Sequence, residues 1–88
     1  MLSRQKKNIL ITGGAGFIGS ALIRYLIKET DHQILNLDKL TYAGNVQSLS
    51  SIEKNQRYNL IKGDICNKKL VNELFDKFNP DWVMNLAA

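Results

Sequence analysis

The chain has 88 residues, a hydrophobic content of 44% and a formal net charge of +4, enough for a globular core but small for a complete nucleotide-binding domain. No apolar run approaches the roughly 20 residues of a membrane span, and none has the length of a signal peptide, so no membrane partner is expected. Basic residues cluster at Arg4, Lys6 and Lys7 but do not continue along a helix face, which argues against a nucleic acid partner.

The first predicted element is a strand at residues 9–11, a short apolar run of the kind that is buried on both faces of a sheet. Glycines follow at Gly13, Gly16 and Gly19, with a fourth at Gly14. Their spacing fits both Gly-x-Gly-x-x-Gly at 14–19 and Thr-Gly-x-x-Gly-x-x-Gly at 12–19. Beyond the first glycines a helix is predicted, because apolar residues recur at helical spacing, at Ile18, Leu22, Tyr25 and Leu26.

The turn between this strand and this helix has the composition of a phosphate site. Gly13 or Gly14 allows a tight turn, because glycine takes a positive φ without steric cost. Gly16 lets a pyrophosphate approach the helix start, where unpaired N–H groups and a partial positive charge favour anions. Gly19 is expected to let the helix pack closely against the strand. A glycine-rich turn without a ligand is the alternative, but the flanking strand and helix favour dinucleotide binding.

A second strand is predicted at residues 33–37, after a polar break in which His32 is expected to be a solvated loop residue at the other end of the sheet. The strand ends at Asp38, at the spacing from Gly19 that suits a carboxylate holding the adenosine ribose. An ionised carboxylate repels a 2′-phosphate, so Asp38 favours NAD over NADP, although Lys39 beside it could meet such a phosphate. The alternative is an aspartate that only caps a turn.

The remaining elements alternate in the same way. Residues 46–52 are a candidate short helix, and residues 58–62 a third strand. Asn67 is placed to cap a helix that Asn79 and Pro80 end; its apolar residues share one side, at Leu70, Val71, Leu74, Phe75 and Phe78. With a fourth strand at residues 82–86, the order predicts an α/β fold. We expect a partial Rossmann fold, the first four strands of a doubly wound parallel sheet in the order 3-2-1-4.

Two further features are predicted to have no chemical role. Tyr58 and Lys62 have the spacing of a Tyr-x-x-x-Lys acid/base pair, but on a strand they would lie roughly 13 Å apart, so we interpret them as structural. Cys66 is the only cysteine, which excludes an intramolecular disulfide, and it has no metal-ligating neighbours. We expect a semi-buried thiol in a reducing, cytoplasmic environment.

The glycine turn, residues 12–19, resembles the signature of the extended short-chain dehydrogenases/reductases. Residues 38–45 resemble more specifically a loop of the dTDP-glucose 4,6-dehydratases, as do residues 63–65 and 85–88. The resemblance covers residues 8–88. It implies an enzyme-bound NAD that takes a hydride from C4 of a sugar nucleotide, loss of water across C5–C6, and return of the hydride to C6.

The resemblance also implies roles for individual residues. The backbone of Phe17 and Ile18 would meet the pyrophosphate, and Asp64 would accept a hydrogen bond from the adenine amino group. Others would surround the adenosine ribose, contact adenine or line the path to the nicotinamide ribose. The complete predicted cofactor site consists of Gly13, Gly16, Phe17, Ile18, Gly19, Asp38, Lys39, Leu40, Thr41, Asp64, Ile65, Leu86, Ala87 and Ala88.

Enzymes of the resembled family have much longer chains. Their helical Tyr-x-x-x-Lys pair, Asp-Glu acid/base pair and sugar-nucleotide domain have no counterpart here, so we expect neither a catalytic nor a metal-binding residue. Residues 1–88 are interpreted as the N-terminal part of the dinucleotide-binding domain of a homodimeric parent enzyme, and as self-associating when isolated. The alternatives are a non-catalytic dinucleotide-binding module and a fragment of a related sugar-nucleotide epimerase.

Overall fold

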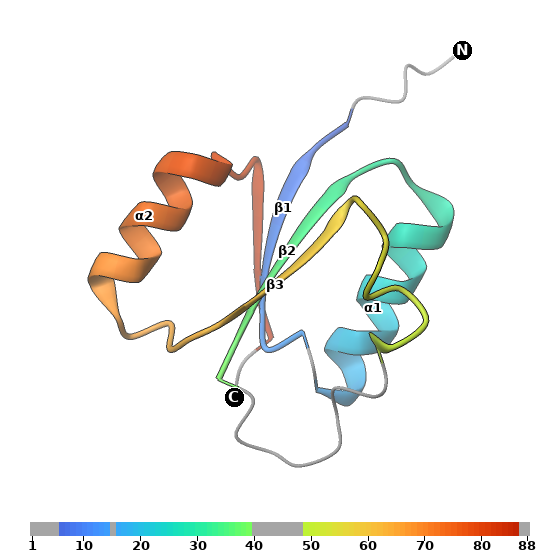
Figure 1. Cartoon of the computed structure of the whole chain (residues 1–88), viewed down its shortest axis with the longest axis horizontal. Coiled ribbons are helices and arrows are strands. Elements are labelled where there is room, and N and C mark those ends of the chain that lie inside the picture. The colour runs from blue at the N-terminus through green and yellow to red at the C-terminus, as the bar shows by residue number, and fades with distance from the viewer. Residues whose placement is uncertain (1–5, 15, 40–48, 87–88) are drawn as a thin grey trace.

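The computed structural model describes residues 6–14, 16–39 and 49–86. Within these ranges the strands form one parallel sheet in the order β3-β2-β1-β4, with α1 on one face and α2 on the other (Figure 1). The predicted fold class and strand order are confirmed, and each strand lies within one residue of its predicted bounds. The elements are β1 (Asn8–Thr12), α1 (Phe17–Glu29), β2 (Gln33–Asp38), β3 (Tyr58–Lys62), α2 (Lys68–Phe78) and β4 (Trp82–Asn85).

The core lies on both faces of the two central strands. Ile9 and Ile11 of β1 belong to the cluster under α1, whereas Leu10, between them, belongs to the cluster under α2. Ile34 and Leu35 of β2 divide between the two faces in the same way. Because successive side chains of a strand point to opposite faces, a strand covered by a helix on each side is expected to be largely apolar. This explains the uninterrupted apolar run from which the first strand was predicted.

The apolar residues whose spacing predicted α1 do not all lie on its buried side. Ile18 and Tyr25 are 71% and 60% exposed. The prediction of a helix is right, but its buried face is turned by one residue, about 100°, from the face that this apolar pattern marks. The residues that α1 buries are Gly19, Ser20, Ile23, Leu26 and Ile27.

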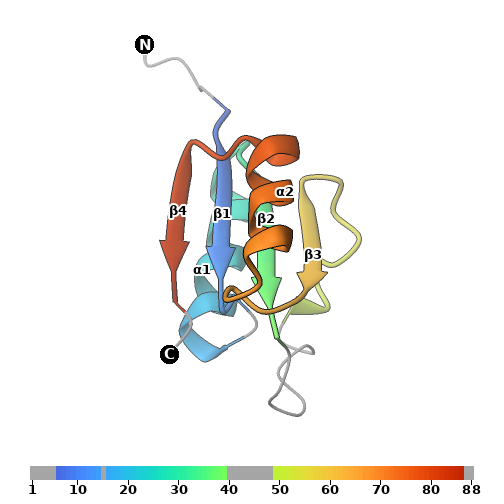
Figure 2. The same ribbon diagram turned by 90° about the vertical axis from the view of Figure 1, so that its left-hand side faces the viewer.

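Helix α2 begins and ends where the sequence predicts. The side chain of Asn67 caps it by accepting a hydrogen bond from the N–H of Leu70 at 3.1 Å. Asn79 ends it in the left-handed conformation, with φ of 51°. Most of the predicted apolar side packs on the sheet, but Phe75 is 43% exposed. Figure 2 shows α2 in front of β2, with β4 at the left edge of the sheet, on the far side of β1.

One smaller expectation falls partly outside the described residues, and another was wrong. Residues 46–48 of the candidate helix at 46–52 are not described; from Leu49 on the chain forms turns, in which Ile52 N–H donates to Leu49 O and Asn55 N–H donates to Ile52 O. Leu49 is nevertheless buried in the core. Cys66 is exposed rather than semi-buried, because it lies in the turn that precedes α2.

Hydrogen bonds and a ring contact hold the amino-terminal end of the sheet together. The guanidinium of Arg57 donates to the carbonyls of Ile27 at 2.7 Å and Thr30 at 2.8 Å, which ties the end of α1 to the start of β3. His32 is half-buried and not a solvated residue as expected. Its Nδ1 accepts a hydrogen bond from Lys7 N–H at 2.9 Å, and its ring packs edge-on against Trp82.

In the part of the chain that the structure describes, no helix is long and apolar enough to cross a membrane.

Candidate functional site

The glycine turn follows β1 at the carboxyl end of the sheet (Figure 1). Gly13 has a φ of 75°, so the positive φ that the sequence predicted for residue 13 or 14 is found at Gly13. The N–H of Gly13 donates to Leu37 O at 3.0 Å, and the N–H of Gly16 donates back to Gly13 O at 3.2 Å. These bonds fold the turn over the end of β2.

Gly19 and Gly16 lack a side chain for different reasons. A Cβ atom at Gly19 would lie 2.6 Å from Gly13 O and 2.8 Å from the Cα of Gly14, both of them backbone atoms. Gly19 therefore allows α1 to pack against the turn, whereas the sequence predicted close packing against the strand. A Cβ atom at Gly16 would meet only Gly13 O, at 3.4 Å. The space beside Gly16 is open.

Helix α1 starts without a side-chain cap. Its N-cap is Gly16, and no side chain accepts a hydrogen bond there. The first helical bond runs from Ser20 N–H to Gly16 O at 2.8 Å, so the N–H groups of Phe17, Ile18 and Gly19 have no partner within the helix. The corresponding end of α2 is capped by Asn67. An uncapped helix start with a positive dipole end is suited to bind an anion.

Acidic and basic side chains meet where β2 and β3 end. Asp38 is buried, 4% exposed, and its carbonyl accepts a hydrogen bond from Gly63 N–H at 2.9 Å. Directly beyond them, the ammonium of Lys39 lies 3.2 Å from a carboxylate oxygen of Asp64. The sequence left Lys39 as a possible partner of a 2′-phosphate, which stays a prediction; in the structure its ammonium is paired with Asp64.

The carboxylate of Asp64 is held in its ionised form. One oxygen accepts a hydrogen bond from the N–H of Cys66 at 2.8 Å, and the other faces the ammonium of Lys39. The Cys66 N–H, and after it Lys39, hold the pKa of Asp64 below its usual value. Asp64 is therefore a hydrogen-bond acceptor throughout the neutral range.

The end of β4 reaches the same region. Leu86 N–H donates to Thr12 O at 2.8 Å, and the hydroxyl of Thr12 donates to the side-chain oxygen of Asn85 at 2.6 Å. Leu86 thus lies beside the last residue before the glycine turn, and its side chain is 39% exposed.

The carboxyl end of the sheet therefore brings together most of the predicted cofactor site. Leu40, Thr41, Ala87 and Ala88 lie outside the described residues, and the roles of all members remain predictions. The predicted members that the structure places at this end are Gly13, Gly16, Phe17, Ile18, Gly19, Asp38, Lys39, Asp64, Ile65 and Leu86.

One residue at this end was missed by the sequence analysis. The amide oxygen of Asn36 accepts a hydrogen bond from the N–H of Gly14 at 2.9 Å, and Asn36 is fully buried in β2. The available signal was a polar residue within an otherwise apolar strand, which is unfavourable unless it is hydrogen-bonded.

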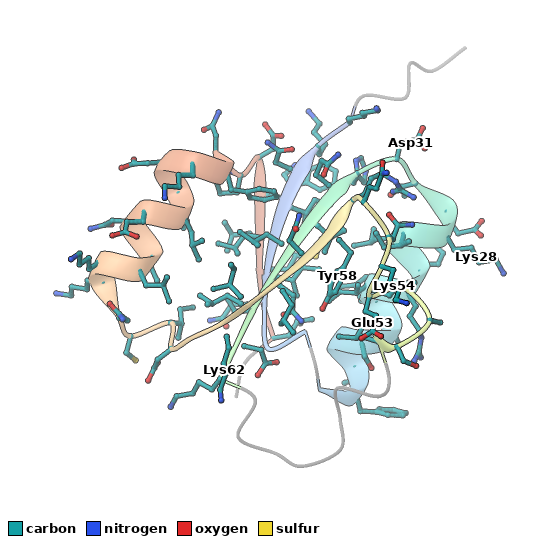
Figure 3. All side chains as sticks on the ribbon, viewed as in Figure 1. Lys28, Asp31, Glu53, Lys54, Tyr58 and Lys62 are labelled. Atoms are coloured by element: carbon teal, nitrogen blue, oxygen red, sulfur yellow. The ribbon has the colours of Figure 1, made fainter. Side chains whose placement is uncertain are left out.

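Tyr58 and Lys62 lie on a strand, as predicted, at its two ends (Figure 3). Tyr58 is buried, and burial raises its pKa above the usual value of 10.0, against the lowering effect of a hydrogen bond from Asn36. Tyr58, with a raised pKa, and Lys62 lie four residues apart on a strand. They therefore cannot act together as an acid/base pair.

Known proteins resemble this chain along nearly its whole length. A family model described as GDP-mannose 4,6 dehydratase matches residues 10–88. The dTDP-glucose 4,6-dehydratase of Salmonella typhimurium is 55% identical over 80 residues, which are 91% of this chain and 22% of the relative.

Solved structures also match nearly the whole length of this chain. The dTDP-glucose 4,6-dehydratase from Bacillus anthracis, in complex with NAD, matches with a TM-score of 0.89 and 38% identity over 93% of this chain and 27% of that one. A UDP-glucuronic acid 4-epimerase from Bacillus cereus, also in complex with NAD, matches with a TM-score of 0.76 and 35% identity over 92% of this chain and 26% of that one. The chain spans about a quarter of the length of the relatives it matches.

Proposed function

Because the chain belongs to the GDP-mannose 4,6-dehydratase family, we propose that it is the NAD-binding portion of a nucleotide-sugar 4,6-dehydratase with dTDP-glucose as substrate. The observation that carries this proposal is the uncapped start of α1 beside a glycine turn that leaves open space at Gly16. The NAD complexes of the similar dehydratase and epimerase support the choice of cofactor.

The start of α1 is the proposed pyrophosphate site. The N–H groups of Phe17 and Ile18 precede the first helical bond and can donate to phosphate oxygens, with the helix dipole adding to the attraction. Phe17 and Ile18 are 90% and 71% exposed. We assign the recognition of the phosphates to their backbone N–H groups. Gly16 leaves the space through which the phosphates reach these groups.

The ends of β2 and β3 are the proposed adenosine site. Asp38 would accept hydrogen bonds from the ribose hydroxyls, with Lys39, Leu40 and Thr41 around the ribose. The ionised carboxylate of Asp64 would accept a hydrogen bond from the adenine amino group, with Ile65 beside the ring. Asp64 also pairs with Lys39, which weakens the attraction of this ammonium for a 2′-phosphate and so favours NAD.

NAD supplies the hydride acceptor when it is bound. The role of this chain is to bind NAD and to orient it. Leu86, together with Ala87 and Ala88, would line the path to the nicotinamide ribose. We assign the acid/base residues and the sugar-nucleotide domain to the remainder of a homodimeric enzyme, because the chain spans about a quarter of its relatives. Residues 1–88 would then be the N-terminal part of its dinucleotide-binding domain.

The test is the product that the full-length enzyme makes from dTDP-glucose. A 4,6-dehydratase gives a 4-keto-6-deoxy sugar nucleotide, with loss of water, which mass spectrometry detects directly. An epimerase gives an isomer of unchanged mass, and a non-catalytic dinucleotide-binding module gives no product. Either of the last two outcomes would overturn the proposed reaction, and NAD binding without product would favour the binding module.

Asp38→Ala in the full-length enzyme is expected to weaken NAD binding by about 1–3 kcal/mol, since charged hydrogen bonds to the ribose are lost. It is also expected to narrow the preference for NAD over NADP, because the repulsion of the 2′-phosphate disappears. Calorimetric titration with both cofactors measures the two effects. Asp76→Ala, which removes an exposed carboxylate from α2, is the matched control. Equal or tighter binding of NADP by the unaltered enzyme would contradict the assignment of Asp38.

A further inference from the structure

Asn36 is a polar residue with no place in the proposed cofactor contacts. It is fully buried in the middle of β2, between Leu35 and Leu37, which lie in the cluster under α2. A buried amide costs free energy unless its donors and acceptor find partners. Here the oxygen accepts from Gly14 N–H at 2.9 Å, and the NH₂ group donates to the hydroxyl of Tyr58 at 3.2 Å. The side chain therefore links the glycine turn to the start of β3.

The contact with Gly14 is close as well as polar. A Cβ atom at Gly14 would lie 2.4 Å from the amide oxygen of Asn36 and 2.5 Å from a methyl group of Ile23. The backbone of the turn thus rests directly on these two side chains. Because Gly13 N–H is taken by Leu37 O, two successive N–H groups of the turn are directed to β2.

This arrangement determines which N–H groups are available to a ligand. The N–H groups of Gly13 and Gly14 donate hydrogen bonds to residues of β2, and the N–H group of Gly16 donates to Gly13 O. The N–H groups left at the helix start are those before the first helical bond. The backbone of the turn also has to stay in place for Gly19, where a Cβ atom would collide with backbone atoms of Gly13 and Gly14.

We propose that Asn36 is a positioning residue for the pyrophosphate site: its amide oxygen holds Gly14, and so fixes the turn that presents the start of α1 to the phosphates. This inference rests on the proposed function. The side chain suits the position: leucine offers no acceptor for Gly14 N–H, and aspartate would place a negative charge behind the pyrophosphate.

Tyr58→Phe provides a matched control for Asn36→Leu. Both substitutions break the same buried network and leave a buried donor without a partner, so both are expected to lower the melting temperature. Only Asn36→Leu removes the acceptor of Gly14 N–H. A residue that merely stabilises the core would give two variants with the same binding properties.

The experiment measures the affinity of the full-length enzyme for NAD, for ADP and for adenosine, which lacks phosphate. We expect Asn36→Leu to weaken NAD and ADP by about tenfold or more while adenosine changes by less than about twofold. Tyr58→Phe is expected to leave all three affinities within about twofold of the unaltered enzyme. If Asn36→Leu does not fold, Asn36→Ser, whose hydroxyl is too short to reach Gly14, is expected to show the same selective loss.

Several results would overturn the inference. Equal losses for ADP and adenosine would reduce Asn36 to a stabilising residue, as would equal losses for the Asn36 and Tyr58 variants or unchanged binding by the Asn36 variants. An unaltered enzyme that binds no NAD would overturn the proposed function itself, and this inference with it. Normal NAD binding with no effect at Asn36 would overturn the inference alone.

Discussion

Gly16→Val is expected to abolish NAD binding by the full-length enzyme while its melting temperature changes little. The extended backbone of Gly16, with φ of −71° and ψ of 174°, accepts a branched residue, and a Cβ atom there meets only Gly13 O at 3.4 Å. The side chain would fill the space through which phosphates reach the start of α1. Loss of two charged hydrogen bonds corresponds to about 3 kcal/mol or more, or over about 100-fold in Kd.

Gly19→Ala is the informative counterpart, because its added methyl group would collide with the protein instead of with the ligand. The atoms in its way are backbone atoms at 2.6 and 2.8 Å, so the turn would have to move. We expect a loss of stability of about 1–3 kcal/mol together with a loss of NAD binding. Thermal melts and calorimetric titrations of both variants separate the two effects. Normal NAD affinity in Gly16→Val would place the phosphate site elsewhere.

The fold was predictable from the sequence because the two central strands are largely apolar runs with clear ends. Parallel strands covered on both faces leave this signal, and alternation with helices then limits the topology to few choices. The buried face of α1 was not predictable in the same way. Ile18 and Tyr25 have the spacing of core residues, and nothing in the local pattern shows that Gly19 has to face the turn.

Most of the candidate site was also predictable, because every parallel strand ends at the same edge of the sheet. What the sequence could not give were contacts that depend on strand pairing. The ion pair of Lys39 with Asp64 follows from the pairing of Asp38 with Lys62. The hydrogen bond that Gly14 N–H donates to the side chain of Asn36 joins residues 22 positions apart, and its only trace in the sequence is one amide within a largely apolar strand.

The 88-residue chain produced alone is expected to self-associate, to bind NAD weakly at best and to show no dehydratase turnover. The lack of turnover follows from the proposal that the acid/base residues lie in the remainder of the enzyme. The association follows from β4, which pairs with β1 and has no further strand beside it in the described part of the chain. A sheet edge of this kind is a template for pairing with another chain.

Two of the exposed residues on this edge are large and apolar, which strengthens the expectation. Trp82 and Val83 are 46% and 49% exposed, and α2 lies in front of β2 instead of β4 (Figure 2). Light scattering over a range of concentrations, with an NAD titration and a dTDP-glucose assay, measures all three properties. Val83→Lys places a charge at the edge and is expected to reduce the association. A stable monomer that binds NAD tightly would contradict this prediction and favour an autonomous dinucleotide-binding module.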